Sequence, residues 1–125
     1  MLQNLTLLLA RVLMSAIFIQ AGYGKLLGYS ARVAYFTKLG LPFPPGAWAV
    51  AVTIELVGGL LILSGYRTRQ VAPAMAAFCV ATAFIAHYHP DDAGQMIHFM
   101  KNICMAGGFL ALAAAGPGRL AIGRA

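Results

Sequence analysis

Charged side chains are scarce in this chain. Only 3 of its 125 residues are acidic and 9 are basic, so 10% are charged, whereas a soluble domain carries about 25%. So few charges cannot form the polar coat of a soluble enzyme, and a hydrophobic share of 61% excludes a disordered tail. The mean hydropathy of +0.79 also indicates a chain that is too apolar for a soluble protein. At this length the composition favours one integral membrane domain over residues 1–125.

The basic residues do not gather into the patch that a nucleic-acid-binding domain needs, although the pI is about 9.8. They stand at the ends of apolar runs, where a membrane protein meets lipid phosphates. We therefore expect a lipid bilayer as the partner and no nucleic acid. The residues at these ends are Lys25, Arg32, Lys38, Arg67, Arg69, Arg119 and Arg124.

Cysteine is also rare, with two in the chain. Cys79 and Cys104 form no Cys-x-x-Cys motif and stand in no metal-ligand spacing. We interpret them as small buried hydrophobic residues. A redox pair across adjacent spans is the alternative.

The histidines give a weak metal signal. His87 and His89, followed by Asp91 and Asp92, are residue types that bind zinc or copper. A His-x-His pair in a loop is common by chance, so we expect no metal site.

Four apolar runs dominate the sequence, and none alternates with period two as a membrane strand would. Each is close to the roughly 20 residues that a helix needs to cross the hydrocarbon layer. Residues 29–39 predict a short amphipathic helix in the first loop, either lying in the headgroup plane or packed as a lid over the bundle. We predict an all-α membrane protein, a four-transmembrane-helix bundle, with spans at about residues 5–24, 47–65, 70–87 and 97–115.

Polar side chains inside these spans are costly, since inserting a central charge costs about 2.5–3.5 kcal/mol. Glu55 lies near the middle of the second span, too deep for its short side chain to reach water. Arg11 shares with Ser15 and Phe18 the face of the first span that should point into the bundle. We predict that Glu55 faces the bundle interior and contacts Arg11, as an intramembrane pair, or else Lys101 or another polar group. The alternative for Arg11 is to extend to the headgroups.

The fourth span opens with three polar residues on one helical face. His98, Lys101 and Asn102 stand at i, i+3 and i+4. Gln20 and Lys25, near the end of the first span, should lie at the same level. We predict that these five residues line an outward-side pocket for a ligand such as a quinone. Plain contact with headgroups, which needs no cavity, is the alternative.

Three segments, in order along the chain, resemble the DoxX family. They read ARVLMSAIFIQAGYGK in the first span, IELVGGLLILSGYRTR in the second and KNICMAGGFLALAAAGPGR in the fourth. The resemblance implies a small four-helix protein of the bacterial inner membrane. Founding members are small subunits associated with a thiosulfate:quinone oxidoreductase, and others accompany quinone, catechol or thiol-stress functions. The loop that carries His87 and His89 is not part of the resemblance.

Two functional hypotheses follow. One is a quinone-interacting small subunit or accessory of a membrane oxidoreductase. The chain has no haem, flavin or nicotinamide motif, so we expect no intrinsic cofactor beyond a bound quinone, and a redox partner protein would hold the electron-transfer cofactor. The other is a non-enzymatic membrane scaffold, chaperone or small carrier. Whether the chain is itself an enzyme and whether it forms a homo-oligomer stay open.

We predict that both termini are cytoplasmic. Four spans place the termini on one side, the loop between the second and third spans carries only basic charge, and the next loop carries Asp91 and Asp92 without Lys or Arg. A reporter that is active only in the cytoplasm should be active when fused after Ala125 and silent when placed within residues 88–95. Activity in the reverse pattern would contradict this topology.

Overall fold

The computed structural model describes residues 1–123 and, over that part of the chain, contains helices and no strands. Its elements are α1 (Leu2–Leu27), α2 (Tyr29–Lys38), α3 (Pro44–Thr53), η1 (Ile54–Gly58), α4 (Gly59–Ser64), α5 (Thr68–Thr82), η2 (Ala83–His87) and α6 (Ala93–Ala115), where η marks a π-helical turn.

Four helical stretches within residues 1–123 are long and apolar enough to cross a membrane. The predicted all-α fold with four spans is therefore confirmed. Each stretch begins a few residues earlier than the hydropathy predicted, because hydropathy marks the hydrocarbon layer and not the helix end. The stretches are Leu2–Leu27, Pro44–Ser64, Thr68–His87 and Ala93–Ala115.

The helix ends coincide with residues that favour them. Pro44 opens α3 in its first turn, where the missing N–H is not needed. The Asp92 side chain accepts a hydrogen bond from the Gln95 N–H and caps α6. Gly65 ends α4 with a φ of 80°, a left-handed conformation that glycine adopts without strain.

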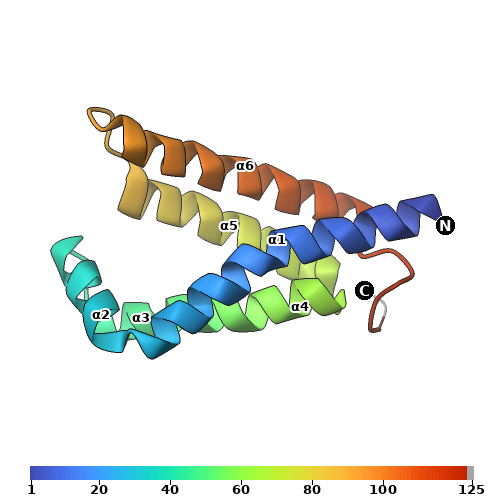
Figure 1. Ribbon diagram of the computed structural model, residues 1–125, viewed down its shortest axis with the longest axis horizontal. Coiled ribbons are helices and arrows are strands. Elements are labelled where there is room, and N and C mark those ends of the chain that lie inside the picture. The colour runs from blue at the N-terminus through green and yellow to red at the C-terminus, as the bar shows by residue number, and fades with distance from the viewer. Residues whose placement is uncertain (124–125) are drawn as a thin grey trace.

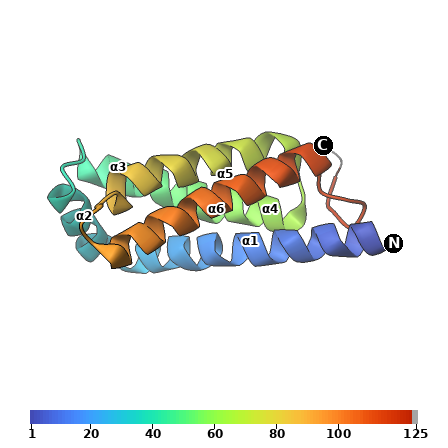
Figure 2. The same ribbon diagram turned by 90° about the horizontal axis from the view of Figure 1, so that it is seen from above.

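The spans form two helix pairs that come together at one end of the bundle and diverge at the other (Figure 1). α5 packs along α6, and α1 packs along α3, η1 and α4. Figure 2 shows the N-terminus and the segment after α6 at the end opposite α2. We call the end near the N-terminus the closed end and the end near α2 the open end.

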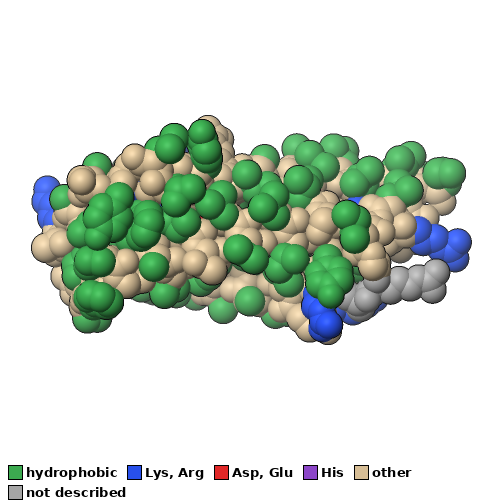
Figure 3. Space-filling view, turned by 90° about the horizontal axis from the view of Figure 1, so that it is seen from below, with side chains coloured by type: hydrophobic (Ala, Val, Ile, Leu, Met, Phe, Trp, Pro, Cys, Tyr) green, Lys and Arg blue, Asp and Glu red, His purple; other side chains and the backbone are tan. Residues whose placement is uncertain are grey.

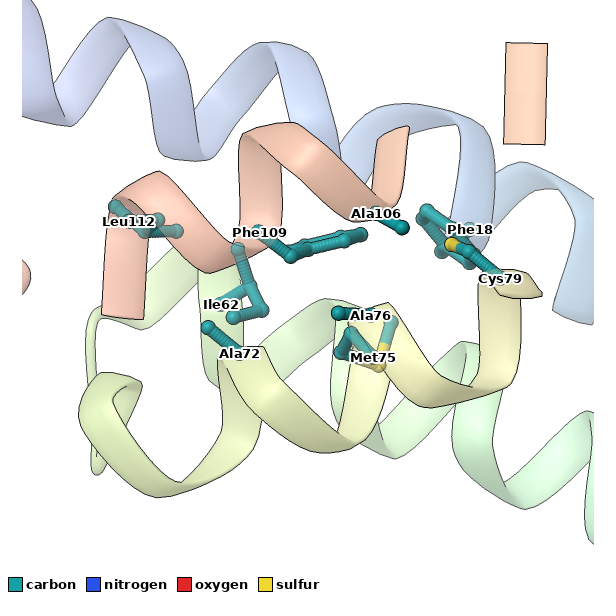
Figure 4. Close-up of a cluster of buried hydrophobic side chains, with 9 residues drawn as sticks. All are labelled: Phe18, Ile62, Ala72, Met75, Ala76, Cys79, Ala106, Phe109 and Leu112. Carbon is teal, nitrogen blue, oxygen red and sulfur yellow. The ribbon is translucent and has the colours of Figure 1, made fainter. Parts of the chain in front are cut away.

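The hydrophobic core lies where the two pairs meet (Figure 4). Adjacent glycines allow this approach: a Cβ on Gly58 would lie 2.5 Å from the Met75 sulfur of α5, and one on Gly59 would lie 2.8 Å from Ile19 of α1. The second span therefore packs closely against a neighbour on each side, as small residues permit in membranes. The core residues are Phe18, Ile62, Ala72, Met75, Ala76, Cys79, Ala106, Phe109 and Leu112.

The outer surface is apolar over most of its length. Figure 3 shows one face, on which hydrophobic side chains spread along the bundle and the visible Lys and Arg side chains stand mainly toward its ends. Leu9, Leu60 and Leu110 are all more than half exposed. A surface of this kind suits lipid tails, whereas in water it would promote association. Arg124, which was counted among the basic residues, lies outside the described residues.

Arg11 is fully buried at the closed end. Its guanidinium donates to the Leu63 carbonyl, 2.9 Å away, and to the Leu120 carbonyl. The segment after α6 is fastened beside it, since the Ile122 N–H donates to the Ser64 carbonyl at 2.8 Å. The predicted Arg11–Glu55 pair is not formed, and Arg11 does not extend to the headgroups. Arg11 instead joins α1, α4 and the segment after α6.

We expect Arg11→Met to lower the free energy of unfolding by about 2–5 kcal/mol, because it leaves two buried carbonyls without their donor. Reversible unfolding in mixed micelles measures this loss. Arg67→Met is the control: Arg67 is exposed and its guanidinium lies over the neighbouring Tyr66 ring, so its loss should change stability by about 0.5 kcal/mol or less. Equal effects of the two substitutions would contradict the role of Arg11.

Candidate functional site

A cavity of about 600 Å³ lies between the two helix pairs, beside α2. All four spans and α2 contribute to its walls. Its volume is in the range of pockets that enclose small organic ligands. Most of the lining residues are apolar: Ile17, Phe18, Ala21, Ala31, Phe36, Ala51, Phe78, Ala86 and Met105.

The main polar feature of the cavity is an ion pair between α1 and η1. The Lys25 ammonium lies 3.0 Å from Oε1 and 3.2 Å from Oε2 of Glu55, and the two side chains are 15% and 8% exposed. Side chains on a helix lean toward its N-terminus. Because α1 and the second span are antiparallel, Lys25 and Glu55 lean toward each other, whereas Arg11 leans away from Glu55. Lys25 is therefore the ion-pair partner of Glu55, the role that was predicted for Arg11.

The surroundings fix the Lys25 position. A Cβ on Gly22 would lie 3.1 Å from the Glu55 Cβ, so the glycine lets the two helices approach at the ion pair. The Trp48 indole donates to the Lys25 carbonyl at 2.8 Å, which satisfies a carbonyl in the last turn of α1. Trp48 in turn packs edge-on against Tyr29, with ring centroids 4.7 Å apart.

The facing wall, formed by α5, η2 and α6, carries neutral hydrogen-bonding groups. Asn102 Nδ2 donates to Thr82 Oγ1 at 2.9 Å and to the Cys79 carbonyl at 3.4 Å. At the rim, His87 Nδ1 and Gln95 Oε1 are 2.9 Å apart. The cavity therefore has an ion pair on one wall and amide, hydroxyl and imidazole groups on the other.

α2 covers the mouth of the cavity. Phe36 is buried, and Arg32 and Tyr35 also line the cavity. Of the two alternatives for residues 29–39, the structure favours the lid packed on the bundle, because four residues of this helix, Ala31 among them, form part of the cavity wall.

Two of the five residues predicted for the ligand pocket line this cavity. Lys25 and Asn102 do so, whereas Gln20, His98 and Lys101 are exposed on the outside. Neighbouring residues on a helix point about 100° apart, so turning Asn102 inward turns Lys101 outward. The same geometry separates Gln20 from Lys25 by about 140°.

The structure does not bring the cysteines or the loop histidines together. Cys79 lines the cavity, whereas Cys104 is exposed on α6, and both thiols are free. The rings of His87 and His98 lie 5.3 Å apart, while His89 is exposed in the loop. Within residues 1–123 no group of three or more His, Cys, Asp or Glu side chains is placed to hold a metal ion.

Both π-helical turns of the described chain border the cavity. Glu55 belongs to η1, and η2 ends with Ala86 and His87. Such turns rotate the side chains that follow them and are frequent at functional sites. Sequence reasoning did not detect these turns, and it did not include the lid residues Arg32 and Tyr35 in the pocket. The amphipathic pattern of residues 29–39 was the available signal for the lid.

The sequence of this chain is similar to those of a known family and of two known proteins. The DoxX family model matches residues 6–88, which include Lys25, Arg32 and Glu55. The chain is similar to inner membrane protein YqjF of Escherichia coli strain K12, with 39% identity over 123 residues, 98% of this chain and 93% of the relative. It is also similar to inner membrane protein YphA of the same strain, with 38% identity over 123 residues, 94% of this chain and 88% of the relative. No solved structure matches at a significant level.

We predict that Lys25 and Glu55 are energetically coupled. Lys25→Met or Glu55→Leu alone leaves an unpaired buried ion and should cost about 3–5 kcal/mol of stability, whereas the double variant should recover most of that loss. Unfolding free energies in mixed micelles measure the coupling. Lys38→Met is the matched control, because Lys38 is exposed at the end of α2 and its loss should not rescue Glu55→Leu. A double variant whose loss equals the sum of the single losses would contradict the coupling.

Proposed function

The chain belongs to the DoxX family, and we propose that it is a quinone-binding accessory of a membrane oxidoreductase. It is an integral membrane protein with four spans in its described part. Because both relatives are named as bacterial inner membrane proteins, we assign this chain to the same membrane. In this proposal the chain supplies the quinone site, and a redox partner protein carries the electron-transfer cofactor.

The observation that carries the proposal is an ion pair set in an otherwise mostly apolar cavity. A quinone needs an apolar slot for its ring and one or two donors for its carbonyl oxygens. The Lys25 ammonium, which Glu55 holds at the cavity wall, is a donor of this kind. Asn102 on the facing wall already donates to Thr82 and Cys79, so Lys25 is the donor on which the proposal rests. Phe18 and Phe78 offer aromatic surface for the ring.

The same groups suit the chemistry of a quinone site. Negative charge develops on the oxygens of a quinone as it is reduced, and an ammonium held beside such an oxygen stabilises that charge. Glu55, in direct contact with Lys25, is a carboxylate placed to exchange a proton with the same quinone oxygen. The apolar walls strengthen both interactions, because little water screens them.

The location of the cavity supports entry from the bilayer. It lies between helix pairs that diverge toward α2, within a bundle whose outer surface is apolar. In this proposal a lipid-soluble ring reaches the Lys25–Glu55 pair from between these spans.

We predict that a short-chain quinone quenches the fluorescence of Trp48 saturably in nanodiscs. Trp48 is the only tryptophan of the chain and its indole is bonded to the Lys25 carbonyl, so it reports occupancy beside the ion pair. Ala21→Phe, which fills the cavity from α1, should weaken quinone binding about tenfold or more, because the added ring occupies the space that the quinone needs.

Ala16→Phe is the control for this measurement, because Ala16 lies on the same helix and is exposed. It should leave binding unchanged. Quenching that rises linearly with quinone concentration, without saturation, would contradict the quinone site and favour the scaffold or carrier function. An equal effect of the two substitutions would contradict the placement of the site.

A further inference from the structure

One cationic side chain of the cavity has no anionic partner. Arg32 extends from α2, lines the cavity mouth and lies against α1, where its Nη2 would be 3.9 Å from a Cβ on Gly24. Within residues 1–123 no carboxylate lies within 4.0 Å of its guanidinium, and the one ion pair formed is that of Lys25 with Glu55. Lys25 and Glu55 neutralise each other, so Arg32 leaves the cavity with a net positive charge.

No carboxylate of residues 1–123 pairs with this guanidinium, and Asp91, exposed in the turn before α6, forms no ion pair with it either. The three acidic residues of the chain are Glu55, Asp91 and Asp92. Glu55 is paired with Lys25, and Asp92 caps α6 in the turn after η2. His87, the other titratable group at this rim, pairs with the Gln95 side chain. Arg32 is exposed at the cavity mouth, so its guanidinium is free to bind an anion from outside the protein.

We propose that the cavity binds a ring that carries an ionised oxygen, and that Arg32 is the residue that binds this oxyanion. This inference rests on the proposed quinone site and deepens it by naming the ligand class, an acidic hydroxyquinone or a similar ring. A guanidinium donates in a planar fork that matches oxyanions, and such charge-assisted hydrogen bonds are about twice as strong as neutral ones.

The arrangement of the cavity orients such a ligand. Phe36 and Tyr35 of α2 stand beside Arg32, so the ring rests on aromatic surface while its charged oxygen stays at the mouth. The carbonyl oxygens then reach toward Lys25, deeper between the helices. A charge is cheapest near the interface and most costly at the bilayer centre, so this orientation has the lowest electrostatic cost.

A matched pair of naphthoquinones tests the assignment. Lawsone carries an acidic hydroxyl that is ionised at neutral pH, and menadione carries a methyl group at the same ring position. Equilibrium dialysis against protein in maltoside micelles, with subtraction of uptake by empty micelles, should show about tenfold tighter binding of lawsone, a difference of about 1.4 kcal/mol.

Arg32→Gln should lower lawsone binding to the level of menadione and leave menadione binding unchanged. Arg32→Lys should restore part of the preference. Lys38→Gln, on the same helix but outside the cavity lining, should retain all of it.

The outcomes separate this inference from the function on which it rests. Equal binding of the two naphthoquinones, or a preference that survives Arg32→Gln, overturns the role of Arg32 and leaves the quinone site standing. If the protein binds neither naphthoquinone, both the role of Arg32 and the quinone site are overturned. A lipid phosphate is the other source of an oxyanion, so the dialysis is repeated in phosphatidylglycerol nanodiscs. A preference that persists there supports the ring oxyanion, and one that disappears there assigns Arg32 to the lipid headgroup and overturns the proposal.

Discussion

The pairing of Lys25 with Glu55 is the constraint on which the open end of this bundle depends. Each ion alone would be costly between apolar helices, and separating a buried pair typically costs about 3–5 kcal/mol. The pair, at 3.0 Å, joins α1 to η1 on one side of the cavity, and α5, η2 and α6 line the other side. A cavity with one charged wall and one neutral polar wall results.

The two cations on the inward side of α1, Arg11 and the partly buried Lys25, are satisfied in different ways. Arg11 satisfies its guanidinium with the carbonyls of Leu63 and Leu120 and so needs no acid. That arrangement closes one end of the bundle and leaves Glu55, the only acidic residue within a membrane span, for Lys25. The closed end is packed around Phe109 and Ile62, both fully buried, whereas the open end keeps space for a ligand.

Hydropathy and helical periodicity were sufficient to predict the four spans and the inward face of α1, because apolar length and the 3.6-residue repeat are local properties. They also predicted that Glu55 faces the interior. They did not predict its partner, since that depends on how side chains lean on antiparallel helices, which favours Lys25 over Arg11. Lys101 and Asn102 show a further limit: their i+3 and i+4 spacing from His98 predicted one pocket, but the orientation of α6 leaves Lys101 exposed and turns Asn102 to the cavity. The π-helical turns depend on tertiary packing and have no local signature, and the amphipathic pattern of residues 29–39 indicated a lid without assigning Arg32 to the cavity.

A photoreactive azidoquinone, applied to the protein in nanodiscs and mapped by mass spectrometry, tests most directly whether the cavity beside the ion pair is the ligand site. Labelling should fall on cavity residues of α1 and α5, such as Ile17, Ala21 and Phe78, and excess unlabelled quinone should abolish it. Labelling confined to exposed side chains of α6, such as Ile97, Met100 and Cys104, and unaffected by competitor, would contradict a quinone site in this cavity.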